Sequence, residues 1–307
     1  MKKTILLILT LLTISMNSHA CDKGCTMGGN YFGILPQFHK HFIGLRHTTR
    51  SYTITSTHTH MHEGRPMTHT DMVDETYTTT ELWGRFVPMR NVQIFTFAPY
   101  AINEQMTSRG STKFTGLGDV TLLANYSLIN TGDSVNHSFK HTLQVGGGVK
   151  LATGKHTMHQ DGSADNINLQ PGTGSTDYIA NAIYTVRYSK VGLSNELAYR
   201  LNGRNQHDYK FGDRITASAN AFYWQQVDKI SFLPSAGLYY EHAKGDEFAN
   251  THKTQKGGDG YYSNLGLNMY ISNIALGGTL QMPISSTDGH HATKGNSRTM
   301  LNLTYMF

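Results

Sequence analysis

Histidine and methionine gather in a few short segments of this sequence, and their side chains offer its clearest chemistry. The chain of 307 residues carries 17 His and 13 Met. In an extended strand, His58, His60 and His62 lie on one side at steps of about 6.6 Å, close enough for neighbouring imidazoles to chelate one ion. The candidate metal ligands predicted from these segments are His58, His60, Met61, His62, Met67, His69, His156 and His159.

The ligand types predict which metal these segments would take. Imidazole with thioether suits copper, whereas imidazole alone suits zinc or nickel. The sequence therefore predicts copper or zinc as an optional ligand, and no required cofactor. No fixed spacing defines a closed site, so the alternative is that the segments form polar, pH-responsive surface.

The N-terminus has the features of an export signal. Lys2 and Lys3 give a positive start, Ile5–Ile14 is an apolar stretch too short to span a bilayer, and a small-x-small cleavage site ends at Ala20. Residues 1–20 are therefore predicted to be a signal peptide.

The mature chain should then begin at Cys21, with lipid attachment to that cysteine as the alternative. Export places Cys21 and Cys25 in an oxidising compartment, where they form a tight disulfide, stay free or bind a soft metal. Residues 21–40 are predicted to be a periplasmic extension or a plug.

Composition and periodicity define the elements that position these residues. Charged residues are only 15% of the chain, and 26 Lys+Arg against 21 Asp+Glu form no basic patch, so nucleic acid is not an expected partner. No run of about 18 apolar residues occurs, which excludes a helical membrane protein. Alternation of period two recurs instead, as in Leu122, Ala124, Tyr126 and Leu128 against Thr121, Asn125 and Ser127, and predicts strands throughout.

The connections between these strands alternate in length. Short ones fall near 88–91, 189–190, 227–229 and 272–273, a medium one at 130–137, and long polar ones near 57–75, 103–117, 153–175, 203–212, 243–259 and 285–297. The two ends of a membrane barrel face different compartments, which explains such segregation. Residues 41–307 are therefore predicted to form an all-β, transmembrane antiparallel up-and-down barrel of about 12 strands, with short periplasmic turns and long extracellular loops in the outer membrane.

The last strand supports this prediction. Leu301, Leu303, Tyr305 and Phe307 alternate with polar residues, and the chain ends on the aromatic. This ending resembles the C-terminal signature by which the assembly machinery of Gram-negative bacteria recognises outer-membrane barrels. A soluble secreted β-sandwich is the alternative.

Three stretches in the middle of the chain resemble a known family. They are Gly116–Asp119 (GLGD), Gly148–Gly154 (GVKLATG) and Leu169–Asp177 (LQPGTGSTD). Together they resemble the outer-membrane barrels associated with transport in the phenol-degradation meta-pathway, with Ala152 where that family usually has Pro. The resemblance covers about 110–240 and implies a transporter-like channel, without implying phenol as the solute.

Residues opposite the lipid-facing positions are predicted to line the lumen. The charged members of this set are Arg46, Arg50, Glu81, Arg85, Lys140, Lys150, Arg187, Glu196 and Arg200. Because seven bases face two acids, the lumen should prefer anionic or neutral solutes. The alternative is that Arg and Glu pair across a packed lumen and stiffen the wall.

The expected function is passive or facilitated passage of small solutes across the outer membrane, with the lipid bilayer, the solutes and the assembly machinery as partners. Two alternatives stay open: a metal-binding component acting through the His/Met segments, and a surface barrel without transport. An enzyme is not expected, because Glu81, Glu196 and Glu241 are isolated carboxylates and no nucleophile motif accompanies a histidine.

Overall fold

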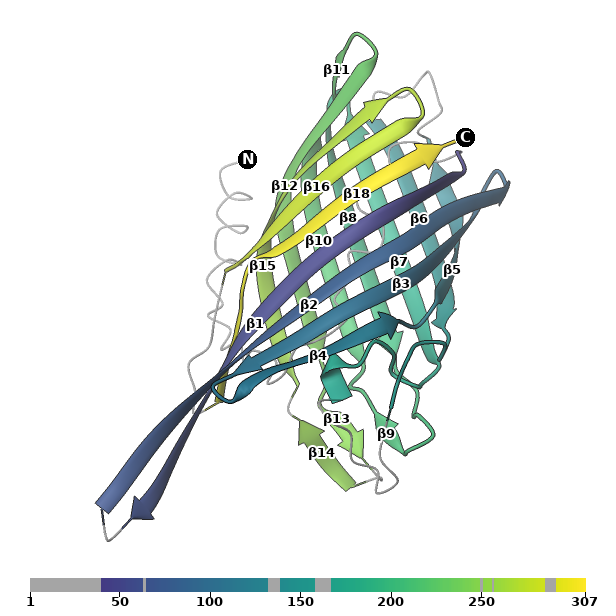
Figure 1. Cartoon of the computed structure of the whole chain (residues 1–307). Helices are drawn as coiled ribbons and strands as arrows, with labels where there is room; N and C mark the ends of the chain where they lie inside the picture. The colour runs from purple at the N-terminus through teal and green to yellow at the C-terminus, as the bar shows by residue number, and fades with distance from the viewer. Residues whose placement is uncertain are drawn as a thin grey trace, which may run out of the picture.

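Twelve antiparallel strands form a closed barrel in the computed structural model, which describes residues 40–62, 65–131, 139–157, 167–248, 251–255, 257–284 and 291–307 (Figure 1). The barrel strands are β1 (Phe42–His62), β2 (Arg65–Met89), β3 (Val92–Thr107), β5 (Thr121–Asn130), β6 (Phe139–Lys150), β7 (Asp177–Tyr188), β8 (Val191–Leu201), β10 (Arg214–Tyr223), β12 (Ile230–Ala243), β15 (Gly258–Ile271), β16 (Ile274–Pro283) and β18 (Arg298–Met306). Each pairs with its neighbour in sequence, and β18 pairs with β1 to close the wall. The predicted all-β barrel of 12 strands is confirmed.

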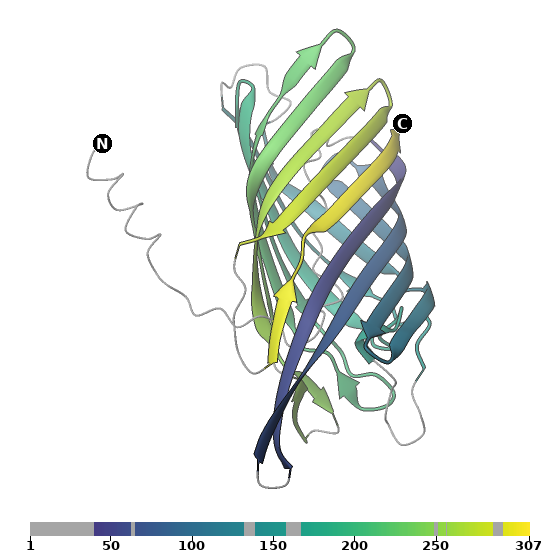
Figure 2. The same cartoon turned by 60° about the vertical axis from the view of Figure 1, so that its left-hand side comes forward.

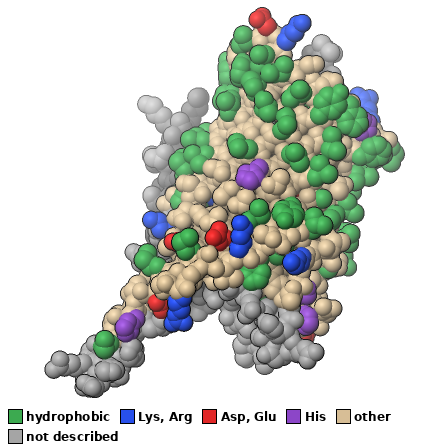
Figure 3. All heavy atoms as spheres, in the orientation of Figure 1, with side chains coloured by type: hydrophobic (Ala, Val, Ile, Leu, Met, Phe, Trp, Pro, Cys, Tyr) green, Lys and Arg blue, Asp and Glu red, His purple; other side chains and the backbone are tan. Residues whose placement is uncertain are grey.

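Side chains alternate between the inside and the outside of the wall. On β5, Leu122 and Tyr126 are 38% and 49% exposed, whereas the intervening Leu123 and Asn125 are 1% and 2% exposed. Hydrophobic side chains cover much of the wall seen in Figure 3, and charged ones gather toward its two ends. This is the pattern of a wall that faces lipid, because only every second residue meets the bilayer.

The connections at one end are tight turns. Ser189, Asp228 and Ser272 each adopt a positive φ, between 50° and 53°. Such turns match the right-handed twist of the strands that they join. The residue before β1 and the residue after β18 also pair at this end of the barrel (Figure 2). The His41 amide donates to the Phe307 carbonyl at 3.1 Å, and the Phe307 amide donates to the His41 carbonyl at 2.9 Å. Short turns mark the periplasmic end of such barrels.

The opposite, outer end differs from the prediction in its first two connections. The segments 57–75 and 103–117 are not loops but hairpins: β1 and β2 continue to a tip after His62, and β3 continues into β4 (Gly110–Leu117). Both segments are rich in Thr, whose branched side chain favours strands even where neither face is apolar. Hydrophobic alternation identifies only strands that meet lipid, so it missed these extensions.

Smaller elements complete the outer end. The two-stranded part of the first hairpin, Thr57–His62 with Arg65–Thr70, is called the outer arm below, and it projects beyond the barrel (Figures 1 and 2). β17 (His291–Gly295) pairs with β1 at Tyr52–Ser56, on the barrel side of the outer arm. β9 (Tyr209–Lys210), β13 (Asp246–Phe248) and β14 (Thr251–Gln255) form a small sheet. The short 3-10 helix η2 (Ile167–Leu169) lies in another outer connection, and β11 (Gln225–Val227) is at the periplasmic end. Within the described ranges, no helix is long and apolar enough to cross a membrane.

Candidate functional site in the barrel interior

The structure places the predicted lumen residues on interior positions of the wall. Arg46 lies opposite Glu81, and Lys140 lies opposite Arg187. The side chains of Arg50, Arg85, Lys150, Glu196 and Arg200 are all buried, with at most 9% of their surface exposed. The signal peptide and residues 21–39 of the expected extension lie outside the described residues.

The interior nearer the periplasmic end also holds a large apolar cluster that sequence reasoning missed. Its members are Phe42, Trp83, Phe95, Phe97, Leu123, Ile179, Ile183, Phe222, Leu233, Tyr270, Ala275 and Met306, with Trp224 packed against it. Strand β3 shows why it was missed, because Ile94 faces lipid while Phe95 faces inward and the alternation disappears. The loss of alternation in this strand was the available signal. A strand with apolar residues on both faces must contact lipid on one face and a packed apolar interior on the other.

Guanidinium groups lie on the aromatic rings of this cluster. The Arg46 guanidinium carbon is 5.1 Å from the centre of the Trp83 ring and 5.3 Å from that of Phe97. Arg85 lies 5.0 Å above Phe42, and its Nε donates to the Lys40 carbonyl at 2.9 Å. These distances are those of cation–π contacts. Charge is therefore held inside the apolar half by aromatic faces as well as by carboxylates.

Glycines on neighbouring strands make room for the large interior side chains. A Cβ atom added at Gly192 would lie 2.2 Å from Phe222 Cζ, and one at Gly148 would lie 2.6 Å from Leu123 Cδ2. The Phe222 and Leu123 side chains thus lie against the neighbouring strand in space that a larger residue than glycine would occupy. The glycine positions of the wall therefore match the large side chains that pack inside it.

Toward the outer end, the interior is held by charge. Arg298 makes a two-pronged pair with Glu241, with Nη1–Oε2 at 3.1 Å, and its Nη2 also donates to the Tyr52 and Tyr262 hydroxyls at 3.0 and 2.6 Å. The Tyr239 hydroxyl donates to Glu241 at 3.1 Å. These residues come from β1, β12, β15 and β18, so the network links the strands of this sector of the wall. Arg298 was missed because the last strand begins earlier than its apolar alternation shows.

Acidic side chains are more numerous inside than the sequence predicted. Glu75, Asp119, Asp177 and Glu241 are buried and join Glu81 and Glu196. Glu81 accepts from Arg46 Nε at 2.8 Å, and Glu75 accepts from the Tyr77 hydroxyl at 2.7 Å. These four acidic residues reduce the expected excess of basic over acidic side chains in the lumen, although Arg214 and Arg298 add two basic ones. The Arg46–Glu81 and Arg298–Glu241 pairs follow the alternative in which opposing charges stiffen the wall.

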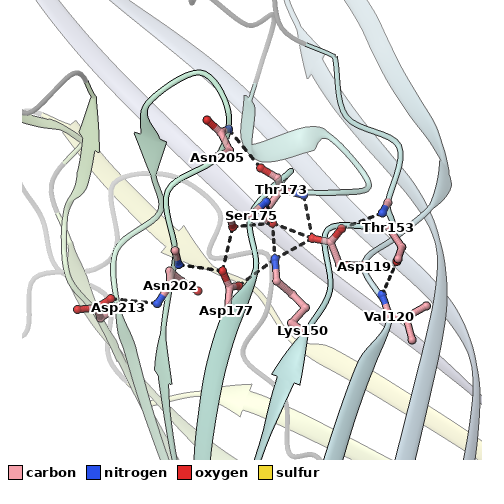
Figure 4. A network of polar contacts seen from close by, with 12 residues as sticks. Asp119, Val120, Lys150, Thr153, Thr173, Ser175, Asp177, Asn202, Asn205 and Asp213 are labelled. Atoms are coloured by element: carbon pink, nitrogen blue, oxygen red, sulfur yellow. Dashed lines mark hydrogen bonds and ion pairs between the residues drawn. The ribbon is translucent and has the colours of Figure 1, made fainter.

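The three family-like stretches meet in one buried network at the outer mouth (Figure 4). Lys150, with no exposed surface, extends its ammonium between Asp119 at 2.7 Å and Asp177 at 2.9 Å. Its remaining donor reaches the Thr173 hydroxyl. An ammonium has three N–H donors, and each has an acceptor here, which is what a fully buried lysine requires.

Backbone amides complete the coordination of the two carboxylates. Asp119 accepts from the amides of Gly154 and Thr173, both at 2.9 Å. Asp177 accepts from the Ser175 hydroxyl at 2.9 Å and from the Gly203 amide at 3.1 Å. The network therefore ties β5, β6 and β7 to the connections that follow β6 and β8. We call it the mouth network: Asp119, Lys150, Thr173, Ser175 and Asp177.

The connection between β6 and β7 enters the outer mouth of the barrel. The described parts of this mouth loop are residues 151–157 and 167–176. Leu169, with no exposed surface, packs against the inward-facing Tyr52 and Tyr77, and its carbonyl accepts from the Asn103 side chain at 2.8 Å. Leu169 is thus surrounded by side chains of the inner wall, so this part of the mouth loop lies inside the barrel.

Two groups outside the membrane-spanning strands have shifted pKa values, His156 in the mouth loop and Asp213 after β9. Burial and the nearby His207 lower the pKa of His156, against the opposing effect of Asp119, and the two imidazole centres are 5.7 Å apart. Burial would raise the pKa of Asp213, but hydrogen bonds from the Asn202 amide, Lys244 and Lys210 hold it below its usual range.

The predicted metal ligands divide between two places. His58, His60, Met61, His62, Met67 and His69 all lie on the outer arm, whereas His156 belongs to the mouth loop. His159 lies outside the described residues. Within the described part of the chain, no group of three or more His, Cys, Asp and Glu is arranged to hold a metal ion.

Comparison with known proteins supports the fold. No family model and no curated protein matches the chain. It is similar to the solved structure of an outer membrane channel from Pseudomonas putida F1, at 14% identity and a TM-score of 0.61, over 92% of this chain and 100% of that one. Weaker matches include the β domain of the Bordetella autotransporter BrkA (11% identity, 87% and 99% covered, TM-score 0.44) and a mutant of the monoaromatic hydrocarbon channel TodX (6%, 88% and 91%, 0.44).

The protein is an outer-membrane β-barrel. The closed twelve-stranded wall and the fold shared with the Pseudomonas channel establish this. The resemblance to the phenol-degradation family stays a prediction.

Proposed function

We propose that this barrel is a channel for small neutral or anionic solutes, with the mouth loop as its obstruction at the outer end. The observation that carries the proposal is the row of charged groups along the interior. It runs from Arg85 and Arg187 near the periplasmic turns, through Arg46, to Arg298 and Lys150 near the outer mouth.

A barrel that served only as an anchor could be filled with apolar side chains instead, although carboxylates compensate Arg46, Lys150 and Arg298 here. Each buried charge costs several kcal/mol unless partners compensate it, and an apolar filling of similar volume is often at least as stable. Charged side chains that line a passage are, by contrast, the usual means by which pores select solutes. Arginine on an aromatic face offers a cationic surface for anions beside apolar surface for neutral solutes.

The fold gives independent support. The Pseudomonas putida structure, which covers nearly the whole of this chain, is an outer membrane channel. Twelve strands also lie between the eight that side chains fill and the sixteen that leave a wide water channel. The expected passage is narrow and depends on how the interior side chains and the mouth loop move.

Single-channel recording in planar bilayers tests the proposal. The refolded protein should give small, stable current steps, and the reversal potential in a KCl gradient should show anion preference. The double variant Asn103→Ala/Leu169→Ala loosens the mouth loop and should give larger steps. The matched control is Leu267→Ala, which faces lipid and should leave the steps unchanged.

One result would overturn the proposal. If wild type and the mouth-loop variant are both folded, as shown by heat-modifiable migration in gels, and both are silent, the barrel does not conduct. Its role would then lie in its outer surface.

A further inference from the structure

Two sets of interior residues share one arrangement, in which a glycine lies between asparagines on the two neighbouring strands. Directly paired residues have their side chains on the same face of a sheet, so the glycine leaves space between two carboxamides. One set, called the Gly146 triplet below, consists of Gly146 on β6, Asn125 on β5 and Asn181 on β7. The other set shows what such an arrangement can bind.

In the second set, called the Gly237 triplet, the protein fills this space itself. Gly237 on β12 is paired with Asn220 on β10 and Asn264 on β15, and the Asn264 side-chain amide donates to the Asn220 carbonyl oxygen at 3.0 Å. Gln281 donates to the Asn264 carbonyl oxygen, also at 3.0 Å, and Asn220 donates to the Ser218 hydroxyl at 3.4 Å. One carboxamide beside the glycine is therefore bound by another.

The Gly146 triplet has the same pairing but makes no such bond. Asn125 and Asn181 are 2% and 7% exposed, and among the described residues neither the nitrogen nor the oxygen of either carboxamide has a hydrogen-bond partner. A Cβ atom added at Gly146 would collide with Asn125 Oδ1, so this carboxamide lies against the interior surface of β6. Burying carboxamides without partners costs stability, because they lose the hydrogen bonds that water would make. A partner that enters from the lumen would restore these bonds.

The surroundings of the Gly146 triplet are small or uncharged. Ala198 follows in the same row, opposite Asn181. The interior positions two residues before and after each member of the triplet hold Leu123, Ser127, Gln144, Gly148, Ile179 and Ile183. An ion at this position would lose its hydration without gaining a counter-charge. A neutral group that both donates and accepts hydrogen bonds would find both kinds of partner, because each carboxamide offers donors and an acceptor.

We propose that Asn125 and Asn181 form a binding position for neutral solutes that carry a carboxamide or a similar group with both a donor and an acceptor. A solute carboxamide would make here the contact that Asn264 makes with Asn220 in the Gly237 triplet. It reaches the position when interior side chains move, as the narrow passage requires. This inference rests on the proposed channel and names one class of its solutes.

The flux of a neutral diamide, compared with ion conduction, tests this position. The probe is malonamide, which drives swelling of proteoliposomes if it passes through the barrel. In Asn125→Leu/Asn181→Leu, the side chains keep nearly the same volume and lose every hydrogen-bonding group. The ratio of the malonamide swelling rate to the single-channel conductance in KCl should fall at least about fivefold, as expected for the loss of one net hydrogen bond.

The matched control is Asn220→Leu/Asn264→Leu in the Gly237 triplet. These carboxamides already bind each other, so the ratio should stay that of wild type. This variant removes the acceptor of Gln281 and should lower the temperature at which heat-modifiable migration in gels is lost. Asn125→Leu/Asn181→Leu should not lower that temperature, because leucine replaces carboxamides that have no partner in the wall.

Two results would overturn the proposal, and they are distinct. If wild type conducts and the ratio in Asn125→Leu/Asn181→Leu stays the same or rises, the amide position is wrong, and the two carboxamides bind ordered water alone. If folded wild type neither conducts KCl nor swells in malonamide, the channel itself is wrong and the amide position fails with it.

Discussion

The two halves of the barrel interior are stabilised in different ways. Near the periplasmic turns, aromatic side chains fill the space left by glycines, and arginines rest on their rings. Near the outer mouth, buried carboxylates hold Lys150 and Arg298 by direct pairing. Close packing of apolar side chains stabilises the periplasmic half, and compensated buried charge stabilises the outer half.

This difference teaches what each half tolerates. A packed apolar cluster loses stability in proportion to the volume removed or added. A buried charge network loses most when one partner is removed, because the remaining charge has no compensation, and loses little when the whole set is neutralised. The outer half should therefore be the more sensitive to single substitutions.

The largest effect is expected from Lys150→Met. The substitution leaves Asp119 and Asp177 as two buried carboxylates without their shared cation. The free energy of unfolding, measured by urea titration in lipid vesicles, should fall by about 3–5 kcal/mol. Lys155→Met, in the exposed part of the same loop, should have almost no effect.

A compensated variant sharpens this prediction. Lys150→Met combined with Asp119→Asn and Asp177→Asn leaves no unpaired charge, so much of the lost stability should return. If the triple variant is less stable than Lys150→Met alone, charge compensation is not what holds the outer mouth.

A smaller difference is expected between two buried arginines. Arg298→Met leaves Glu241 without its partner and should cost about 3 kcal/mol. Arg85→Met loses a cation–π contact with Phe42 and a hydrogen bond to a carbonyl, and should cost about 2 kcal/mol. Parallel urea titrations compare the free energies of unfolding of the two variants. A larger loss of stability for Arg85→Met would contradict the view that compensated charge stabilises mainly the outer half.

The apolar half should respond to added volume. Gly192→Ala places a Cβ atom 2.2 Å from Phe222 Cζ and should destabilise the barrel by about 1–3 kcal/mol. Gly278→Ala is the matched control, because its nearest contact is a lipid-facing Leu301 atom at 3.5 Å. Adding Phe222→Leu to Gly192→Ala should recover part of the loss, and failure to do so would mean that the backbone sets the cost.

The sequence predicted the barrel better than its contents, for physical reasons. Lipid imposes alternation on one face, so residues such as Leu265 and Leu301 revealed their strands. The interior accepts both polar and apolar side chains, so no sequence pattern identified Phe95 and Phe97 as lumen residues. The mouth network could not be predicted either, because Asp119, Lys150 and Asp177 are distant in sequence and meet only in the closed barrel.

Acid should loosen the mouth loop slightly, the smallest effect expected. Because burial and His207 lower the pKa of folded His156, the neutral imidazole stabilises the loop fully above the ordinary histidine pKa of about 6.5, and this contribution is lost as the pH falls toward the lowered value.

Hydrogen exchange of residues 151–157 and 167–176 measures this loosening directly. Exchange, corrected for its intrinsic pH dependence, should be faster at pH 5.5 than at pH 7.5 in wild type and nearly equal at the two values in His156→Gln. His207→Gln removes the imidazole that helps to lower the pKa of His156, so it should move the transition to higher pH. The imidazole of His156 already fills the space beside Gly174, whose φ is +70°, so its protonation changes the charge there and not the packing. Equal pH dependence in wild type and His156→Gln would assign the acid sensitivity to another group.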